Sequence, residues 1–361
     1  MHRVLPVFFA MCLAGAAQEF RFAVSGDSRN CGDVVMPAVA SGVLKSGASF
    51  YWHLGDFRAI YDFDEDMAPP AALRLSTPHL NIISYLTKAW PDFIDHQLKP
   101  FGGLEIFLAP GNHEMIFPQK REMYRAQFES YLNSGRLREQ RDRDKDAGAF
   151  RTYYHWTMNG TVDFISLDNA SDNAFDAAQM AWIRERLAED GKSRAITTIV
   201  VGMHEALPGS KGLSHSMCDS PAGVASGREV YNRLWDLRKA GKKVYLLASH
   251  SHFVMDDVYN TPYWAGRVLP GWIVGTAGAV RYRLPPGQTG SAVARTDVYG
   301  YLAAAVAGDG SIRFEFKEMS LDDLRMANAG KTPDSLVQWC YEENKEQTIP
   351  APGACTEGAR K

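Results

Sequence analysis

The chain has 361 residues, of which 45% are hydrophobic and 22% are charged, and this composition excludes a disordered, collagen-like or coiled-coil protein. The formal net charge is −3, so no overall positive field favours binding to nucleic acid or to an anionic membrane surface. A small anionic substrate would have to be held locally, by a metal ion or by a few placed cations.

The first 17 residues have the layout of a secretory signal peptide. A short basic start at residues 1–3 precedes an apolar run at residues 4–13, and small residues suited to cleavage follow at positions 14–17. The run is too short to span a bilayer, and no other stretch approaches the roughly 20 apolar residues of a membrane helix. We therefore predict a secreted or periplasmic protein without a transmembrane segment. An N-terminal anchor and a buried strand are the alternatives for this stretch.

Short strand-like runs recur along the chain, and the first five end in polar clusters. These five runs lie at residues 20–25, 50–54, 104–109, 196–201 and 244–248. Helical patterns lie between them, at residues 34–45, 80–98, 123–132, 177–188 and 228–240. The alternation of strands and helices predicts a layered α/β fold. Polar clusters at strand ends fit open α/β sheets, which bind ligands just beyond their strand termini.

The remaining segments complete the expected domain. Further strands are predicted at residues 272–274, 299–306 and 312–316, and loops at residues 62–76, 135–148, 208–227 and 281–294. The mixed-charge run at 135–148 is typical of a solvated helix or loop. Beyond residue 317 the chain becomes polar, with a helical pattern at 320–328. We therefore predict a catalytic domain over residues 18–317 and a C-terminal tail over residues 318–361.

Four cysteines remain once Cys12 is removed with the signal peptide: Cys31, Cys218, Cys340 and Cys355. An even number suits an oxidising compartment and allows three pairings. We favour Cys340–Cys355, which closes a short loop in the polar tail. Cys31–Cys218 is then the second pair, because both residues follow polar clusters expected to converge. Four free thiols are the alternative, and no CxxC spacing supports a zinc cluster.

Six side chains that follow predicted strands could ligate metal: Asp27, Asp56, Asn112, His204, His250 and His252. Oxygen and imidazole donors without sulfur are the mix that Zn²⁺, Fe²⁺ and Mn²⁺ accept. In an extended strand, His250 and His252 would face opposite sides, so both reach a metal only where the strand turns. We therefore expect this pair at the end of its strand. Taken singly, each aspartate after a glycine could equally cap a helix or turn a loop.

Five ordered blocks resemble the calcineurin-like metallophosphoesterase family. They are Gly26-Asp27, Gly55-Asp56, Gly111-Asn112-His113-Glu114, His204 after an apolar strand, and Ser249-His250-Ser251-His252. Each block follows a strand, and together they span residues 20 to 256, which makes the match specific. Residues 153–168 and 179–187 also look like the paired strands and following helix of that family. The resemblance implies an α/β fold of four-layer type, a β-sandwich of mixed sheets flanked by helices, with a metal site at the carboxyl ends of the strands.

The resemblance also implies the chemistry of the site. Two divalent metals, among Fe, Zn and Mn, would be held by two ligand sets that share one residue: Asp27, Asp56 and His252 for one metal, and Asp56, Asn112, His204 and His250 for the other. Metal-activated hydroxide would attack the phosphorus of a phosphate mono- or diester. His113 would protonate the leaving oxygen, and Asn112 would also contact the substrate.

Two positions depart from the commonest family pattern. Arg29 stands where many members carry a histidine ligand; a guanidinium cannot ligate metal but can bind phosphate in bidentate fashion. Ala59 stands where many members carry Asp or Tyr, and Tyr61 and Asp62 just beyond it are candidate substitutes that the spacing does not decide between. Arg58 is a second predicted phosphate contact or a solvated loop cation. These departures leave the number of metals open.

We thus predict an exported phosphoesterase acting on a small phosphorylated substrate, with no nucleic-acid partner. The alternative is a metal- or phosphate-binding protein that kept the fold after losing hydrolysis, which Arg29 and Ala59 support and His113 opposes. Glu114 is expected to orient its loop, and His215 has no assigned role. The choice between mono- and diesters and the oligomeric state do not follow from the sequence.

Overall fold

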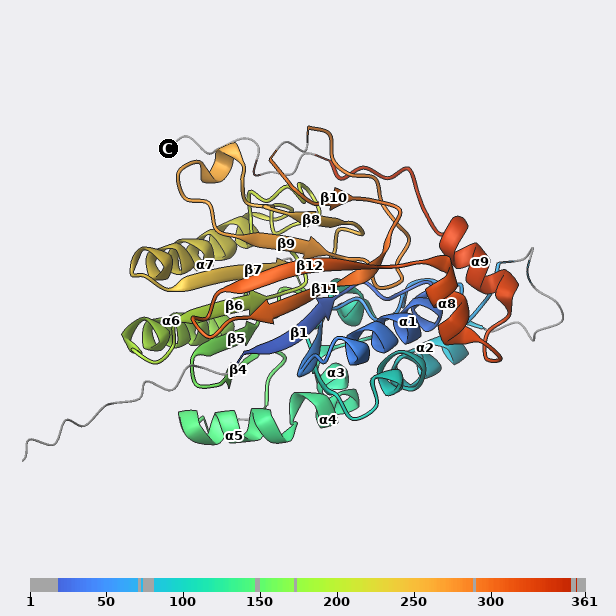
Figure 1. Ribbon diagram of the computed structural model, residues 1–361, viewed down its shortest axis with the longest axis horizontal. Coiled ribbons are helices and arrows are strands. Elements are labelled where there is room, and N and C mark those ends of the chain that lie inside the picture. The colour runs from blue at the N-terminus through green and yellow to red at the C-terminus, as the bar shows by residue number, and fades with distance from the viewer. Residues whose placement is uncertain are drawn as a thin grey trace, which may run out of the picture.

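Two β-sheets form the centre of the protein (Figure 1), for which the computed structural model describes residues 19–70, 73, 81–146, 150–171, 174–287, 290–351 and 355. The first sheet has the order β12-β11-β1-β2-β3. Its strands are β12 (Ile312–Met319), β11 (Tyr299–Val306), β1 (Phe20–Ser25), β2 (Phe50–His53) and β3 (Glu105–Leu108). Because β1, β2 and β3 are parallel, their carboxyl ends meet at one edge of the sheet.

The second sheet has the order β10-β8-β9-β7-β6-β5-β4. Its strands are β10 (Ala294–Arg295), β8 (Val254–Asp256), β9 (Gly271–Val274), β7 (Lys243–Ala248), β6 (Thr198–Gly202), β5 (Val162–Ser166) and β4 (Tyr154–Met158). Strands β5, β6, β7 and β9 are parallel, and antiparallel strands flank them. In the first sheet, β11 pairs antiparallel with both β1 and β12, so both sheets are mixed.

Aromatic side chains form the core between the two sheets. Phe164 of β5 contacts Phe22 of β1 and Phe50 of β2 edge to face, each with ring centroids 5.1 Å apart. Trp156 of β4 meets Phe50 at 5.6 Å in the same geometry. These rings lie on inward-facing positions of both sheets, so burial of their apolar surface holds the sheets face to face.

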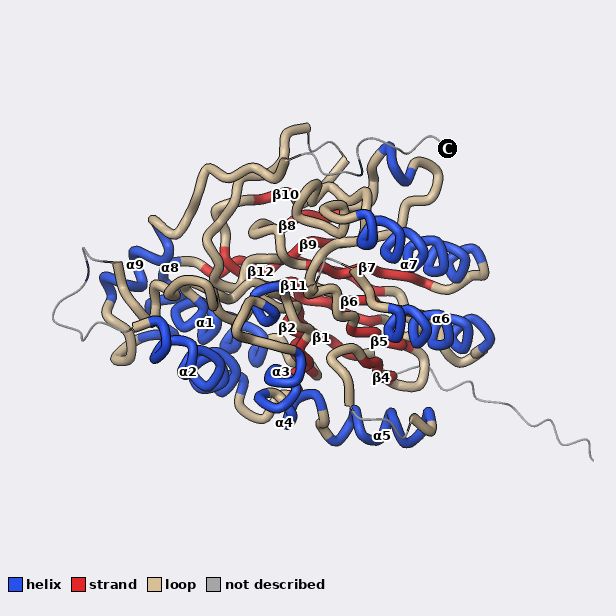
Figure 2. The backbone as a smooth tube through the Cα atoms, turned by 180° about the vertical axis from the view of Figure 1, so that it is seen from behind, coloured by secondary structure: helices blue, strands red, loops and turns tan. Residues whose placement is uncertain are grey.

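Helices cover the outer faces of both sheets, giving four layers. Nine α-helices lie in the described residues: α1 (Gly32–Lys45), α2 (Ile82–Asp92), α3 (Arg121–Gln127), α4 (Glu129–Leu132), α5 (Gly135–Asp144), α6 (Ala177–Lys192), α7 (Pro221–Lys239), α8 (Leu321–Asn328) and α9 (Asp334–Glu342). Helix α1 packs on β11 and β12 and carries α8 on its side. Helices α6 and α7 lie along the seven-stranded sheet (Figure 2) and bury Ile183, Leu187 and Leu234 against it.

The observed elements follow the sequence pattern with a few differences. The predicted helix at 80–98 is α-helical only to Asp92 and continues as a π-helical turn, Phe93–Leu98, while residue 80 lies outside the described residues. The predicted loop at 208–227 is wrong at its end, because α7 begins at Pro221. There the Ser220 side chain accepts a hydrogen bond from the Gly223 N–H and caps the helix. The charged run at 135–148 contains α5, capped in the same way by Ser134.

Both favoured disulfide pairings are wrong. The structure joins Cys31 to Cys340 and Cys218 to Cys355. Helix α9 follows α8 beside α1, which brings Cys340 to the residue that precedes α1. The chain after α9 then runs back along residues 281–283 to the loop after β6, where it meets Cys218. The C-terminal segment is thus tied to the domain and not to itself.

Within the described residues, no helix is long and apolar enough to cross a membrane. The predicted signal peptide, residues 1–17, lies outside them.

Candidate metal centre

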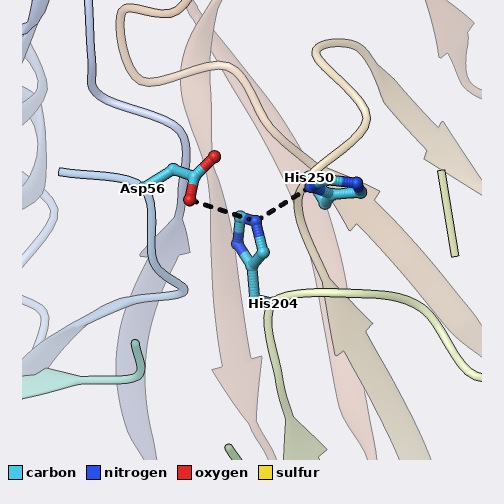
Figure 3. Close-up of side chains that lie close together, drawn as sticks. All are labelled: Asp56, His204 and His250. Atoms are coloured by element: carbon cyan, nitrogen blue, oxygen red, sulfur yellow. Dashed lines mark hydrogen bonds and ion pairs between the residues drawn. The ribbon is translucent and has the colours of Figure 1, made fainter. Parts of the chain in front are cut away.

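The polar clusters at the strand ends of both sheets meet at one place. Asp27 follows β1, Asp56 follows β2, and Asn112 opens a 3₁₀ turn, Asn112–Met115, after β3. From the other sheet, His204 follows β6, and His250 follows β7. Figure 3 shows three of these side chains pointing toward one another from separate loops.

Unusual backbone conformations turn these side chains inward. Asp27, Asp56 and His250 have φ angles of 60°, 59° and 65°, a left-handed region that non-glycine residues rarely adopt. The chain therefore turns sharply at the end of β7, as expected for the histidine pair. Gly111 is needed for close approach, because a Cβ atom there would lie 2.3 Å from Asp56 Oδ1. Strain of this kind persists only where surrounding contacts enforce it, as they do at functional sites.

The first donor set surrounds His204 Nε2. This nitrogen lies 3.3 Å from Asp56 Oδ1, 3.0 Å from Asn112 Oδ1 and 3.0 Å from His250 Nδ1. His204 Nδ1 faces the Leu54 carbonyl oxygen at 2.8 Å, so Nδ1 carries the hydrogen of the neutral ring and Nε2 presents a lone pair. Four acceptor atoms thus converge on one point, an arrangement that suits a divalent cation.

Without a cation, protons compensate the charge of this set. Although burial acts to lower it, the Asp56 carboxylate raises the pKa of His204 to about 10. Although burial acts to raise it, His113 and His204 hold the pKa of Asp56 well below its usual value. Asp56 is therefore ionised, which is the state in which a carboxylate can ligate a metal.

The second donor set consists of Asp27, Asp56 and His252, whose ligand atoms lie within 4.8 Å of one another. Asp27 Oδ1 lies 3.4 Å from His252 Nε2 and is buried without a hydrogen-bond partner. His252 Nδ1 donates to the Val280 carbonyl oxygen at 2.6 Å, which leaves the Nε2 lone pair facing the site. Burial raises the pKa of Asp27 to about 7. An orphaned, buried carboxylate oxygen beside an imidazole lone pair fits a cation.

The structure thus brings together all six residues predicted to hold metal. The two sets share Asp56 and have the composition that the family resemblance implied.

His113 and Glu114 support the same centre from the 3₁₀ turn. His113 Nδ1 donates to the Ala59 carbonyl oxygen at 2.6 Å, and its Nε2 lies 3.6 Å from Asp56 Oδ2. Burial lowers the pKa of His113 to about 4. Glu114 accepts hydrogen bonds from the backbone N–H groups of Asp56 at 2.8 Å and Gly111 at 2.7 Å. It therefore orients two ligand-bearing loops and does not contact the metal donors with its side chain.

The structure places Arg29 in the centre and Arg58 outside it. Arg29 is only 5% exposed, and its Nη2 lies 3.3 Å from His252 Nε2. The Arg58 side chain is 0% exposed and is held by Asp33 at 2.5 Å, by Asp66 at 2.9 Å and by Asp92. Asp64 lies 3.8 Å away as a fourth carboxylate, and a buried guanidinium so engaged has no surface to offer a substrate. The predicted phosphate contact at Arg58 is therefore replaced by a structural ion-pair network.

Comparison with solved structures identifies proteins of similar fold. No protein-family model and no curated protein sequence matches the chain. The structure of PhoD matches with a TM-score of 0.52 and 14% identity, covering 84% of this chain and 72% of that one. The purple acid phosphatase PPD1 from yellow lupin seeds matches with a TM-score of 0.54 and 14% identity, covering 92% of this chain and 57% of that one. The chain therefore spans less than two thirds of the lupin enzyme.

The fold is that of these two solved structures. Two mixed sheets flanked by helices were predicted from the sequence, and this fold class is confirmed. At this level of identity the likeness concerns the fold alone.

Two further residues reach the centre. The Tyr282 ring stacks on His252, with centroids 4.0 Å apart, and its hydroxyl accepts from Arg29 Nη2 at 3.3 Å. The His215 ring lies 5.3 Å from the rings of both His250 and Tyr282. His215 lies in the loop after His204, which was the only sequence signal for it. No sequence signal indicated Tyr282, because its position depends on the hydrogen bond from its N–H to the His252 carbonyl oxygen.

Proposed function

We propose that this protein is an exported, metal-dependent phosphoesterase that hydrolyses a small phosphate mono- or diester. The observation that carries the proposal is the convergence of two donor sets, sharing Asp56, on a fold otherwise found in phosphatases. Two divalent cations, among Fe, Zn and Mn, suit carboxylate, amide and imidazole donors. Two disulfides in the structure are consistent with an oxidising compartment outside the cytosol.

The residues of the centre have different roles in the proposed reaction. The cations, when bound, supply Lewis acidity and a lowered pKa of water for in-line attack on phosphorus. Arg29 directs its guanidinium to the phosphate. Asn112 points Oδ1 at His204, so its amide N–H₂ group faces away from the donor atoms and can donate to a phosphoryl oxygen.

His113 is placed to protonate the leaving oxygen. Ala59 fixes the ring by accepting from Nδ1, and Nε2 carries the proton that is transferred. Burial lowers the pKa of the ring to about 4 even with the Asp56 carboxylate beside it. A phosphate ester next to the ring favours its charged form and raises this pKa. Substrate binding itself therefore favours protonated His113, the form that acts as general acid.

The test compares hydrolysis of aryl phosphate monoesters and diesters by wild type and by His113→Asn, alongside metal content. We expect kcat of His113→Asn to fall by about 10²- to 10⁴-fold, with metal content unchanged. His96→Asn is the matched control, because His96 is a histidine with a side chain 59% exposed on the π-helical turn. Chelation should abolish activity, and added metal should restore it.

A metal- or phosphate-binding protein without turnover is the second candidate. The specific observation that favours it is Arg29, whose guanidinium stands beside the second donor set where many family members have a ligand. Metal-loaded protein that cleaves neither ester class with Mn, Fe or Zn would establish this alternative.

A further inference from the structure

The two donor sets differ in their surroundings. The four-donor position consists of Asp56, Asn112, His204 and His250, and the Arg29-side position consists of Asp27, Asp56 and His252. Among the described residues, hydrogen bonds to the four-donor position come from backbone and neutral side chains, apart from its own histidines. At the Arg29-side position a permanent cation is built into the protein.

Arg29 competes directly with a metal for one ligand atom. Because His252 Nδ1 donates to the Val280 carbonyl oxygen, His252 Nε2 is an acceptor, and Arg29 Nη2 donates to it at 3.3 Å. A metal bound to this nitrogen would need the same lone pair. Arg29 Nε also lies 3.8 Å from Asp56 Oδ2, the shared carboxylate, and has no hydrogen-bond partner.

The guanidinium is anchored and not free to leave. Its Nη1 donates to the Tyr61 hydroxyl at 3.4 Å and its Nη2 to the Tyr282 hydroxyl at 3.3 Å. Tyr282 is in turn fixed by stacking on His252 and by its backbone bond to the His252 carbonyl oxygen. Moving Arg29 aside would break these contacts and expose a side chain that is now 5% exposed.

We propose that Arg29 makes the two metal positions unequal, so that the four-donor position retains its divalent cation when the Arg29-side position has lost it. The guanidinium then supplies positive charge beside the phosphate in place of the missing cation. A divalent cation about 5 Å from a unit positive charge loses roughly tenfold in affinity even at the dielectric of water. The inference rests on the proposed function, because it takes both donor sets to be metal positions.

The experiment measures metal occupancy and not turnover. Metal-free protein is dialysed against graded free Zn²⁺, and bound zinc per chain is determined by mass spectrometry. We expect two binding steps separated by at least about tenfold in free zinc. His250→Ala should remove the tighter step, and His252→Ala should remove the weaker one.

Variants at position 29 test whether Arg29 causes the difference in zinc affinity between the two positions. Arg29→Ala should tighten the weaker step by about tenfold, and Arg29→His, which adds an imidazole, should do at least as much. Tyr282→Phe keeps the ring but removes the hydroxyl that holds Arg29 Nη2. It should therefore reduce the difference in free zinc between the two binding steps while the arginine is still present. Arg313→Ala is the control, because it removes an equal charge from a side chain 77% exposed on β12; it should leave both steps unchanged.

Three results would overturn the inference. In the first, wild type binds two zinc ions in one step. In the second, Arg29→Ala leaves the separation between the two zinc-binding steps unchanged. If the protein still hydrolyses phosphate esters, either result contradicts the inference about Arg29 but not the proposed function. Failure to bind zinc at either position removes both.

Discussion

His155 offers a quantitative test of the electrostatics away from the metal centre. The ring is 7% exposed and lies between two carboxylates, with Nδ1 2.8 Å from Asp163 Oδ1 and Nε2 2.6 Å from Asp144 Oδ2. Arg186 and Asp190 of α6 complete the group of charges that faces it. Although burial acts to lower it, the two carboxylates raise the pKa of His155 to about 9.

The sign of the pH dependence follows from this shift. The folded protein binds the His155 proton more tightly than the unfolded chain, where the pKa is 6.5. The stabilisation is therefore complete below pH 6.5 and is lost as the pH rises through 9. The rise of this pKa from 6.5 to about 9 corresponds to about 3 kcal/mol. Burial raises the pKa of Asp190 to about 8, and this acts in the same direction; because His155 acts to lower that pKa, the Asp190 contribution is larger in His155→Gln than in wild type.

The assay is urea unfolding of wild type, His155→Gln and His96→Gln near pH 6 and near pH 10. Glutamine keeps hydrogen-bonding capacity but does not titrate. We expect the difference in unfolding free energy between wild type and His155→Gln to shrink by about 3 kcal/mol from the lower to the higher pH. His96→Gln, at an exposed ring, should show no comparable change. If the difference in unfolding free energy between wild type and His155→Gln is equal at both pH values, the two carboxylates do not raise the pKa of His155.

Two further predictions concern the loops around the centre. Glu114 Oε2 accepts from the backbone N–H groups of Asp56 and Gly111, and Oε1 accepts from that of Phe57. Glu114→Gln turns one of these oxygens into an N–H₂ group that faces an N–H donor, so it should lower the unfolding free energy by about 2 kcal/mol and weaken zinc binding in the same dialysis. Unchanged zinc binding would show that the carboxylate does not position Asp56. Replacing Cys31 and Cys340 together by serine should cost about 2–5 kcal/mol, measured by thermal or urea unfolding, and non-reduced peptide mapping of wild type should recover these two cysteines in one linked pair. A Cys31–Cys218 peptide would contradict the structure.

Parts of the centre were predictable because they are local. Each ligand directly follows a short apolar strand, and parallel strands in one sheet end at the same edge. The turn at His250, required by the spacing of His250 and His252, is present as a φ of 65°. The role of Glu114 was also predictable, because the backbone groups it holds belong to its own turn and to the neighbouring strand end.

The role of Arg58 was not predictable in this way. Its position two residues after Asp56 suggests a substrate contact, but its partners are Asp33 on α1, Asp64 and Asp66 further along its own loop, and Asp92 on α2. No spacing in the sequence shows that these carboxylates surround one buried guanidinium. Tyr282 is a similar case, because it reaches His252 from a loop with no motif of its own.

The alternation of strands and helices, the order of the polar clusters and the donor types could be read from the sequence, because these depend on residues close together in the chain. Only the tertiary structure decided which cysteines pair, which arginine faces the metal donors and which tyrosine holds it. Cys31 and Cys340 are 309 residues apart, and they meet because α8 returns to pack on α1 and α9 packs on α8. Such contacts depend on where distant segments come to lie, and that follows from burial of side chains across the whole domain.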